Sequence, residues 1–321
     1  MTMLRCAVLD DYQNVALATA DWAALDDRVQ VRSLTSHIAD QDELVAAVAD
    51  CEILVIMRER TPIGEDLLAR LPRLRLLVTS GMRNAAVDVG AARRHGVTVC
   101  GTDSNAQPPV ELTWALLLGL ARRIVVENRA LREGGPWQQS VGADLSGRRL
   151  GLLGLGKIGS RVARIGHAFG MDVTAWSPHL TPQRAAVEHV HLAASKEELL
   201  GSSDFVSVHL VLGEGTRGLL GTAELRRMRP TAFLVNTSRA AIVDQDALAL
   251  ALREGWIAGA GVDVFDIEPL PADHPFRSLP NLLATPHLGY VTERNYQGYF
   301  SQAVQDIAAY LDGTPVRELS V

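Results

Sequence analysis

The sequence predicts an α/β protein with two doubly wound parallel sheets. Short β-rich runs alternate with helical patterns over most of the chain, which is typical of parallel strands joined by helical crossovers. A length of 321 residues suggests two domains of about 150 residues each. A glycine-rich turn between a strand and a helix, at residues 154–159, lies near the middle of the chain. A first domain is therefore expected before the one that this turn opens.

The first hundred residues predict one parallel sheet. Its five strands are expected at residues 6–9, 29–34, 53–57, 74–79 and 97–100, with helical patterns at residues 40–49, 64–70 and 86–95. The strongest helix follows, from Pro109 to about Arg132, and Gly134-Gly135-Pro136 stops it. Its longest apolar stretch, residues 112–120, is too short to cross a bilayer.

A second sheet is predicted from the glycine-rich turn onward. Its strands are expected at residues 150–153, 173–176, 190–192, 205–209, 233–236, 260–264 and 282–284. This pattern assigns residues 103–290 to a dinucleotide-binding domain. A last helix, at residues 293–311, has no strand nearby in the sequence and is expected to pack on the first domain. The first domain is then discontinuous and comprises residues 1–102 and 291–321.

Composition and charge narrow the class of protein. The chain is 47% hydrophobic and 21% charged, enough to build full cores. A net charge of −6 argues against nucleic acid or an anionic membrane as the main partner. Cys6, Cys51 and Cys100 lie in or beside apolar runs, which predicts reduced, buried thiols. The first ten residues predict a strand and not a signal peptide, so we expect a soluble, cytoplasmic protein.

The glycine-rich turn has the pattern Gly-Leu-Gly-Lys-Ile-Gly, which predicts a phosphate-binding turn. The first glycine allows a tight turn, and the second lets the backbone approach a pyrophosphate. The third lets the next helix pack against its strand, with the helix N-terminus facing the anion. Similar turns serve packing alone in other α/β proteins, so the interpretation depends on the rest of the sheet.

The next strand carries the position that normally selects the coenzyme. Dinucleotide sites usually have an acidic residue there, about twenty residues past the glycines, which binds the ribose hydroxyls. Ser177 stands at that position, and Asp172 lies at the other end of the strand. A serine does not repel a 2′-phosphate, yet the nearest following arginine is Arg184. We therefore expect NAD(H) to be slightly favoured, with NADP(H) as the alternative.

Three ionisable residues follow apolar strands of the second sheet. Arg239, Glu268 and His287 lie past the carboxyl ends of strands, where open α/β sheets bind ligands. A histidine can exchange a proton with a carbonyl or alcohol oxygen, and a carboxylate on its other ring nitrogen fixes the tautomer. An arginine can bind a substrate carboxylate in planar geometry. Together they suit hydride exchange between a nicotinamide and a small 2-oxo or 2-hydroxy acid.

Each of these side chains has a simpler interpretation when taken alone. His287 could be a structural histidine, Arg239 a solvated loop charge and Glu268 a loop acid before proline; their shared position at strand ends favours a site. His189 and His191 could lie on one face of a strand, but no third ligand accompanies them, so we expect no metal.

These motifs resemble those of the D-isomer-specific 2-hydroxyacid dehydrogenases over nearly the whole chain. The matching motifs are Gly154-Leu-Gly-Lys-Ile-Gly159, Val208-His-Leu210, Thr216-Arg217-Gly218, Asn236-Thr-Ser-Arg239, Gly261-Val-Asp-Val-Phe265, Glu268-Pro269 and Pro286-His287. The resemblance implies a flavodoxin-like substrate domain and a Rossmann nucleotide-binding domain, with the active site in the cleft between them. It implies Arg239 as the substrate-binding arginine, His287 as the acid/base and Glu268 as its carboxylate partner.

The resemblance also implies which residues contact the ligands. Coenzyme contacts are expected from Gly154, Gly156, Lys157, Ile158, Gly159, Ser177, His209, Thr237, Ser238, Arg239, Asp263, His287 and Gly289. Substrate contacts are expected from Ser80, Gly81, Met82, Arg83, Arg239 and His287. In the family, backbone N–H groups of the loop at residues 79–84 take the substrate carboxylate. Arg83 could read a second anionic group there or be a solvated loop arginine.

The resemblance implies a homodimer, joined through the helix that starts at Pro109 and the arm after it, to about Leu145. Two other functions stay open. A glutamine typically replaces the carboxylate beside the histidine in the formate-oxidising branch, so Glu268 speaks against that branch. Nucleotide sensors related to transcriptional corepressors keep the three catalytic side chains, so the sequence does not separate them from an enzyme.

Overall fold

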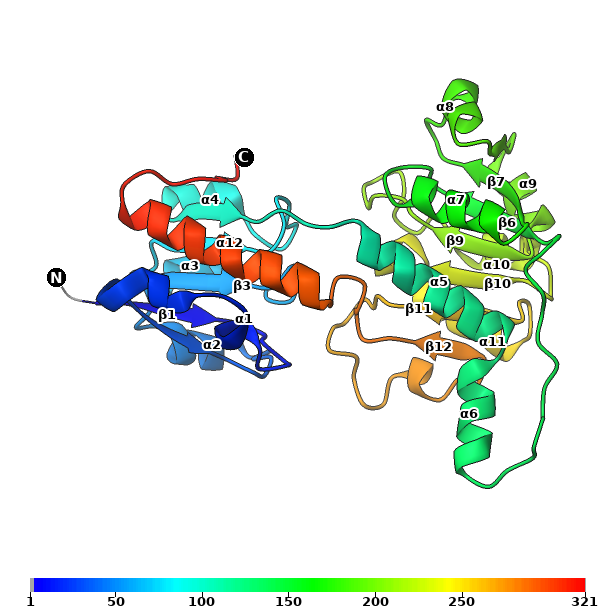
Figure 1. The fold of residues 1–321 in the computed structure, drawn as a ribbon, viewed down its shortest axis with the longest axis horizontal. Helices are drawn as coiled ribbons and strands as arrows, with labels where there is room; N and C mark the ends of the chain where they lie inside the picture. The colour runs from blue at the N-terminus through cyan, green and yellow to red at the C-terminus, as the bar shows by residue number, and fades with distance from the viewer. Residues whose placement is uncertain (1–2, 321) are drawn as a thin grey trace. The chain divides into compact units, whose positions relative to one another are not determined.

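The computed structural model describes residues 3–320; residues 1, 2 and 321 of the predicted substrate domain lie outside the described residues. The chain forms two compact units (Figure 1). Unit 1 runs up to Asn105 and resumes at Thr292, and unit 2 is Ala106–Val291. Each unit is built on one parallel sheet, so the predicted fold class of two doubly wound parallel-sheet domains is confirmed.

Unit 1 has a five-stranded sheet in the order β2-β1-β3-β4-β5, which is the flavodoxin-like order. Its strands are β1 (Leu4–Val8), β2 (Val29–Ser33), β3 (Ile53–Ile56), β4 (Leu76–Thr79) and β5 (Thr98–Gly101). Its helices are α1 (Ala16–Thr19), the 3-10 helix η1 (Trp22–Arg28), α2 (Gln41–Val48), α3 (Glu65–Ala69), α4 (Val89–Arg94) and α12 (Glu293–Leu311). The predicted strands are present with ends shifted by at most two residues.

Helices cover the sheet of unit 1 with apolar side chains. α2, α3 and α4 bury residues such as Leu44, Leu67 and Ala91 against strand residues of one core cluster. The orange-red helix α12 runs across the sheet in Figure 1 and contacts β4, β5 and α1. After α12 the chain pairs with β5, because the Leu319 N–H donates to the Val99 carbonyl at 2.8 Å. The last segment of the chain thereby belongs to the same unit as the first.

Unit 2 has a seven-stranded sheet in the order β12-β11-β10-β9-β6-β7-β8, with its first strand inside the sheet as in Rossmann domains. Its strands are β6 (Arg149–Leu153), β7 (Asp172–Trp176), β8 (His191–Leu192), β9 (Phe205–Val208), β10 (Phe233–Asn236), β11 (Gly259–Val262) and β12 (Leu282–Ala284). Its helices are α5 (Gln107–Ala121), α6 (Ile124–Arg132), α7 (Gly159–Ala168), α8 (Pro182–Val187), α9 (Lys196–Ser202), α10 (Thr222–Arg227) and α11 (Gln245–Arg253), with the 3-10 turns η2 (Ala240–Ile242) and η3 (Pro275–Arg277).

The sheet of unit 2 is buried on both faces. α5 and α7 pack with Leu152 in one core cluster, whereas α9, α10 and α11 pack with Leu153 in the other. Successive residues of a strand point to opposite faces, so this division follows from the pleat. The near-continuous apolar character of these strands is typical of a parallel sheet with helices on both sides.

The predicted single helix from Pro109 to Arg132 is wrong, because the chain forms two helices there, α5 and α6. Arg123 has a φ of 51°, in the left-handed region that a right-handed helix excludes. The Ala121 carbonyl accepts the Ala143 N–H at 2.7 Å. The segment after α6 therefore supplies a hydrogen-bond partner to a carbonyl at the end of α5. Figure 1 shows α6 extending from unit 2 and the following segment running back along the unit.

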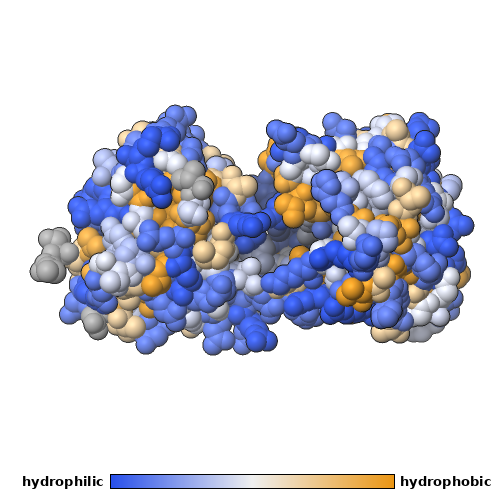
Figure 2. Space-filling model, turned by 90° about the horizontal axis from the view of Figure 1, so that it is seen from above, coloured by the Kyte–Doolittle hydropathy of each residue, from blue (hydrophilic) through white to orange (hydrophobic). Residues whose placement is uncertain are grey.

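Within the described residues, no helix is long and apolar enough to cross a membrane. On the face seen in Figure 2, hydrophobic side chains form separate patches among hydrophilic ones. The three cysteines are buried free thiols, as predicted. Burial raises the pKa of Cys51 to about 11 and that of Cys100 to about 12, so neither is a reactive thiolate near neutral pH.

Candidate active site

The glycine-rich turn joins β6 to α7 at the carboxyl edge of the unit 2 sheet. Gly154 has a φ of 103°, and a side chain there would lie 2.7 Å from the His209 carbonyl oxygen. A side chain at Gly159 would overlap the Gly154 carbonyl, so α7 packs directly on the turn. At Gly156 the corresponding space is open. A tight turn, an open face and a closely packed helix are what a pyrophosphate requires, so these residues fit a dinucleotide.

The strands beside β6 bring two further predicted residues to the turn. The Gly154 N–H donates to the Trp176 carbonyl at 2.9 Å, which places Ser177 next to the turn. His209 follows β9, and its Nε2 lies 2.9 Å from Ser207 Oγ. Burial lowers the pKa of His209 to about 4, so this imidazole is neutral at physiological pH and supports the turn without adding charge.

His287 and Glu268 form the pair that the sequence predicts. His287 Nδ1 lies 2.7 Å from Glu268 Oε2, and the other Glu268 oxygen accepts the Phe265 N–H at 2.9 Å. Both side chains stay partly exposed, at 21% and 27%. Because the carboxylate engages Nδ1, Nε2 is the ring nitrogen left to exchange a proton with a ligand.

Asp263 holds the loop that carries His287. Its Oδ1 accepts from Thr285 Oγ1 at 2.6 Å and from the Leu288 N–H at 2.7 Å, and its Oδ2 accepts the Gly289 N–H at 2.8 Å. His287 itself has a φ of 54°, a conformation that costs energy for a residue with a side chain. The three hydrogen bonds stabilise this strained backbone. Burial raises the pKa of Asp263, and its donors act against that rise.

Arg239 is positioned by the turn after β10. Asn236 closes this turn, since its Nδ2 donates to the Arg239 carbonyl and its Oδ1 accepts the Ser238 N–H, both at 3.0 Å. Thr237 Oγ1 lies 2.8 Å from Thr113 Oγ1 of α5, and Ser238 Oγ donates to the Leu210 carbonyl at 2.5 Å. The Arg239 guanidinium donates to the Ser238 carbonyl at 2.8 Å.

These residues share one edge of the sheet. β10, β11 and β12 are neighbouring parallel strands, so Arg239, Glu268 and His287 all follow carboxyl ends on the same side. β9 joins β10 to β6, which places the glycine-rich turn at this edge as well. The four predicted parts of the unit 2 site therefore lie where open α/β sheets bind ligands.

The predicted substrate loop follows β4 in unit 1. The Ser80 N–H donates to the Ile56 carbonyl at 3.1 Å, and the Gly81 N–H donates to Thr102 Oγ1 at 3.0 Å. These two groups are therefore used inside unit 1, whereas Met82 and Arg83 are exposed. Ser80, Gly81, Met82 and Arg83 all stay predicted substrate contacts, and Met82 and Arg83 are the exposed ones.

Two arginines after β3 were not among the predicted site residues. Arg58 Nη1 donates to the Ser80 carbonyl at 3.2 Å, and Arg60 Nη1 donates to the Asp10 carbonyl at 2.7 Å. The Arg60 guanidinium also stacks 4.3 Å from the ring centre of Tyr12. Their place just after a buried strand is the sequence signal that could have identified them, as it did for the charged residues after the strands of unit 2. Glu59 Oε2 lies 3.6 Å from Arg58 Nε, and Asp10 and Asp11 follow β1 at the same edge, so this end of the unit 1 sheet carries charges of both signs.

In the described part of the chain, no group of three or more His, Cys, Asp or Glu side chains is placed to hold a metal ion. The two histidines considered from the sequence do not share a strand, because β8 begins at His191. His191 Nε2 lies 3.4 Å from Asp172 Oδ1 instead.

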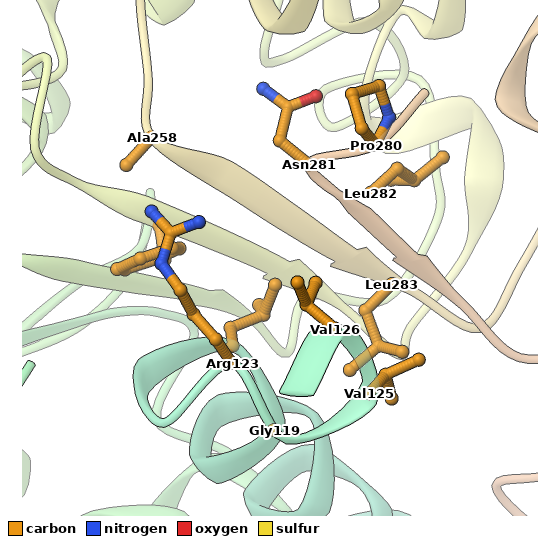
Figure 3. Close-up of a pocket in the computed structure, with 11 residues that line it drawn as sticks. Gly119, Arg123, Val125, Val126, Ala258, Pro280, Asn281, Leu282 and Leu283 are labelled. Atoms are coloured by element: carbon orange, nitrogen blue, oxygen red, sulfur yellow. The ribbon is translucent and has the colours of Figure 1, made fainter. Parts of the chain in front are cut away.

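A pocket of about 90 Å³ lies elsewhere on unit 2, between the end of α5, the start of α6 and β12 (Figure 3). Its lining includes Phe233 and Ala258, at the amino-terminal ends of β10 and β11. Figure 3 shows Val125, Val126 and Leu283 on one side and the Arg123 guanidinium reaching toward Ala258. This is the edge of the sheet opposite the glycine-rich turn, so the pocket is separate from the candidate active site.

A pyrophosphate-type turn and a histidine–carboxylate pair at one sheet edge define a dinucleotide-dependent oxidoreductase. The family model for the D-isomer specific 2-hydroxyacid dehydrogenase, NAD binding domain, matches residues 114–289. The chain belongs to the D-isomer specific 2-hydroxyacid dehydrogenase family.

Named relatives support this assignment. The glyoxylate reductase of Aeropyrum pernix is 40% identical over 260 residues, which cover 77% of this chain and 76% of that protein. The D-3-phosphoglycerate dehydrogenase of Mycobacterium tuberculosis is 38% identical over 279 residues, which cover 86% of this chain but 52% of that longer protein. The crystal structure of a phosphoglycerate oxidoreductase from Vibrio cholerae has a TM-score of 0.92 at 38% identity, covering 97% of this chain and 100% of that one.

Proposed function

We propose that this chain is an NAD(P)-dependent D-2-hydroxyacid dehydrogenase that interconverts a small 2-oxo acid and the matching D-2-hydroxy acid. The His287–Glu268 pair, joined at 2.7 Å on the edge that carries the glycine-rich turn, is the observation that carries this proposal. The relatives named glyoxylate reductase and D-3-phosphoglycerate dehydrogenase are named for small acids of this class.

The residues proposed to hold the coenzyme surround the glycine-rich turn and the strand ends beside it. They are Gly154, Gly156, Lys157, Ile158, Gly159, Ser177, His209, Thr237, Ser238, Asp263 and Gly289. When bound, the nicotinamide supplies or accepts the hydride. The N-terminus of α7 favours the negative charge of the pyrophosphate.

The catalytic side chains have separate roles in this proposal. The Arg239 guanidinium binds the substrate carboxylate and polarises the carbonyl. His287 Nε2 donates a proton to the carbonyl oxygen as it becomes an alcohol, and takes that proton back in the reverse direction. Glu268 holds the imidazole in one tautomer and stabilises its protonated form.

The exposed Arg83 would suit a second anionic group on the substrate. Met82 and Arg83 are the exposed part of the loop after β4, and Arg58 and Arg60 follow the neighbouring strand β3. Guanidinium groups recognise carboxylates and phosphates through planar, charge-assisted hydrogen bonds. We therefore include acids with a distal carboxylate or phosphate among the expected substrates.

A homodimer is part of the proposal, joined through α5, α6 and the arm that follows. The segment exposes Val125 at 54%, Leu131 at 60%, Trp137 at 81% and Val141 at 94%. Apolar side chains gathered on one segment favour burial against another protein surface. A second copy of this chain is the partner that the family resemblance implies.

Oxidation of NADH and NADPH in the presence of single acids tests the proposed activity. The panel contains glyoxylate, pyruvate, hydroxypyruvate, phenylpyruvate and 3-phosphohydroxypyruvate, with formate plus NAD(P) as a separate reaction. We expect turnover with at least one 2-oxo acid and none with formate. Tight NADH binding without turnover of any acid would contradict an enzyme and favour a nucleotide sensor.

A further inference from the structure

The end of β7, where an NAD site normally has a carboxylate that binds the ribose hydroxyls, has no carboxylate in this chain. Residues 173–187, from β7 through α8, contain no aspartate or glutamate. The two carboxylates that flank this segment are already engaged. Asp172 accepts from Arg149 Nε at 3.1 Å, and Glu188 accepts from Arg164 Nε and Nη2, both at 2.9 Å. Neither is placed to bind the ribose hydroxyls as the acidic residue of an NAD site does.

An arginine reaches the turn instead. Arg184 Nε and Nη2 both donate to the Leu155 carbonyl oxygen at 3.3 Å. Leu155 lies between the first two glycines of the turn, so the guanidinium lies against the glycine-rich turn itself. Thr181 caps α8 by accepting the Arg184 N–H on its Oγ1, also at 3.3 Å. This cap fixes the turn of helix that sends the side chain back toward β6.

Ser177 lies beside the same turn. It directly follows Trp176, whose carbonyl accepts the Gly154 N–H, and its own carbonyl accepts the Leu180 N–H at 3.2 Å. The short turn at residues 177–180 therefore leads from the ribose position to α8. A guanidinium has five N–H groups, of which the Leu155 carbonyl uses only part. The others, with the Ser177 hydroxyl, can donate to phosphate oxygens.

We propose that Arg184, together with Ser177, binds the 2′-phosphate of NADPH and makes this chain prefer NADP(H) over NAD(H). The inference rests on the proposed dinucleotide-dependent function. It replaces the slight preference for NAD(H) expected from the sequence, where Arg184 is seven residues past Ser177 and its return to the turn is not visible.

Nucleotide binding tests the inference without turnover. Isothermal titration calorimetry compares NADPH with NADH, and adenosine 2′,5′-bisphosphate with AMP. We expect the phosphorylated member of each pair to bind about tenfold more tightly or better, as for charge-assisted hydrogen bonds to phosphate. Arg184→Gln should remove most of this difference while NADH and AMP affinities stay within about threefold. Arg253→Gln, at the exposed end of α11, removes an equal charge from the same unit and should change neither ratio.

A second variant keeps the test independent of how Arg184→Gln folds. Ser177→Asp restores a carboxylate at the ribose position and should reverse the preference in favour of NADH. An unchanged NADPH-to-NADH ratio in Arg184→Gln overturns the inference, and so does tighter NADH binding by the natural chain. In both cases the proposed function stands. Absence of binding by all four nucleotides contradicts the proposed function and the inference together.

Discussion

His287 depends on two carboxylates that act in different ways. Glu268 contacts the ring itself through Nδ1 and is partly exposed, so it can respond to a charge that develops on the imidazole. Asp263 is buried and contacts only the loop, through Thr285 and two backbone N–H groups. The first carboxylate selects the tautomer and the second holds the strained backbone, so the position of Nε2 requires both.

The proposed role of His287 as the acid/base predicts a specific kinetic defect. His287→Ala should lower kcat by about 10²-fold or more, because it removes the proton donor without removing the coenzyme site. Steady-state rates with the best 2-oxo acid, together with NADPH and NADH affinities, measure this. A kcat near that of the natural chain would rule out His287 as the acid/base.

Several site residues could be predicted because their chemistry is local in the sequence. The glycines at 154–159 and the residues Arg239, Glu268 and His287 lie within a few residues of the carboxyl ends of predicted strands. The position of Arg184 could not be predicted, because no local sequence pattern indicates that its side chain donates to the Leu155 carbonyl. The same holds for the Ser80 and Gly81 N–H groups, whose acceptors are the Ile56 carbonyl in β3 and the Thr102 hydroxyl just after β5.

Among the secondary-structure elements, the strands were predicted more reliably than the long helix. Burial makes central strands such as β3, β4, β9 and β10 nearly continuous apolar runs, and the ends of all strands differ by at most two residues from the prediction. The break between α5 and α6 has no such signal, since Arg123 is neither glycine nor proline. The hydrogen bond from the Ala143 N–H to the Ala121 carbonyl is a tertiary contact, and helix propensity does not predict it.

The segment after α12 contacts unit 1 through Arg317, which lies against the buried carboxyl group of Asp306 on α12. Asp306 is fully buried, and its Oδ1 lies 2.8 Å from Arg317 Nη2. The other Asp306 oxygen has no hydrogen-bond partner among the described residues. Arg317 in turn accepts the Gly101 N–H on its carbonyl, which joins the segment to β5. Burial raises the pKa of Asp306 from 3.8 to about 6.

This raised pKa predicts how stability depends on pH. The folded protein holds the Asp306 proton more tightly than the unfolded chain, so protonation of Asp306 favours the folded state. This contribution to the free energy of unfolding is complete below about pH 4 and is lost as pH rises through about 6. Relative to Asp306→Asn, the natural chain should lose up to about 3 kcal/mol of unfolding free energy across this range. Urea denaturation of both proteins at each pH measures the difference. Parallel pH curves for the two proteins would show that Asp306 does not titrate in this range.

At the scale of the whole molecule, the exposed apolar side chains of α6 and the arm predict an assembly. Sedimentation velocity should show a dimer for the natural chain. Val125→Glu places a charge on the proposed interface and should shift the protein toward monomer. Val187→Glu is the matched control, because Val187 is also exposed, at 75%, but lies on α8. If Val125→Glu stays dimeric, the dimer contact lies elsewhere. A monomeric natural chain would contradict the homodimer.

In the proposed reaction, hydride passes between the nicotinamide and the C2 carbon of a small acid. Reduction with NADPH or NADH deuterated at the transferred C4 position tests this directly, with chiral chromatography and mass spectrometry of the product. We expect a D-2-hydroxy acid that carries deuterium at C2, and loss of its formation in His287→Ala. An L-product, or a product without deuterium from the coenzyme, would contradict it.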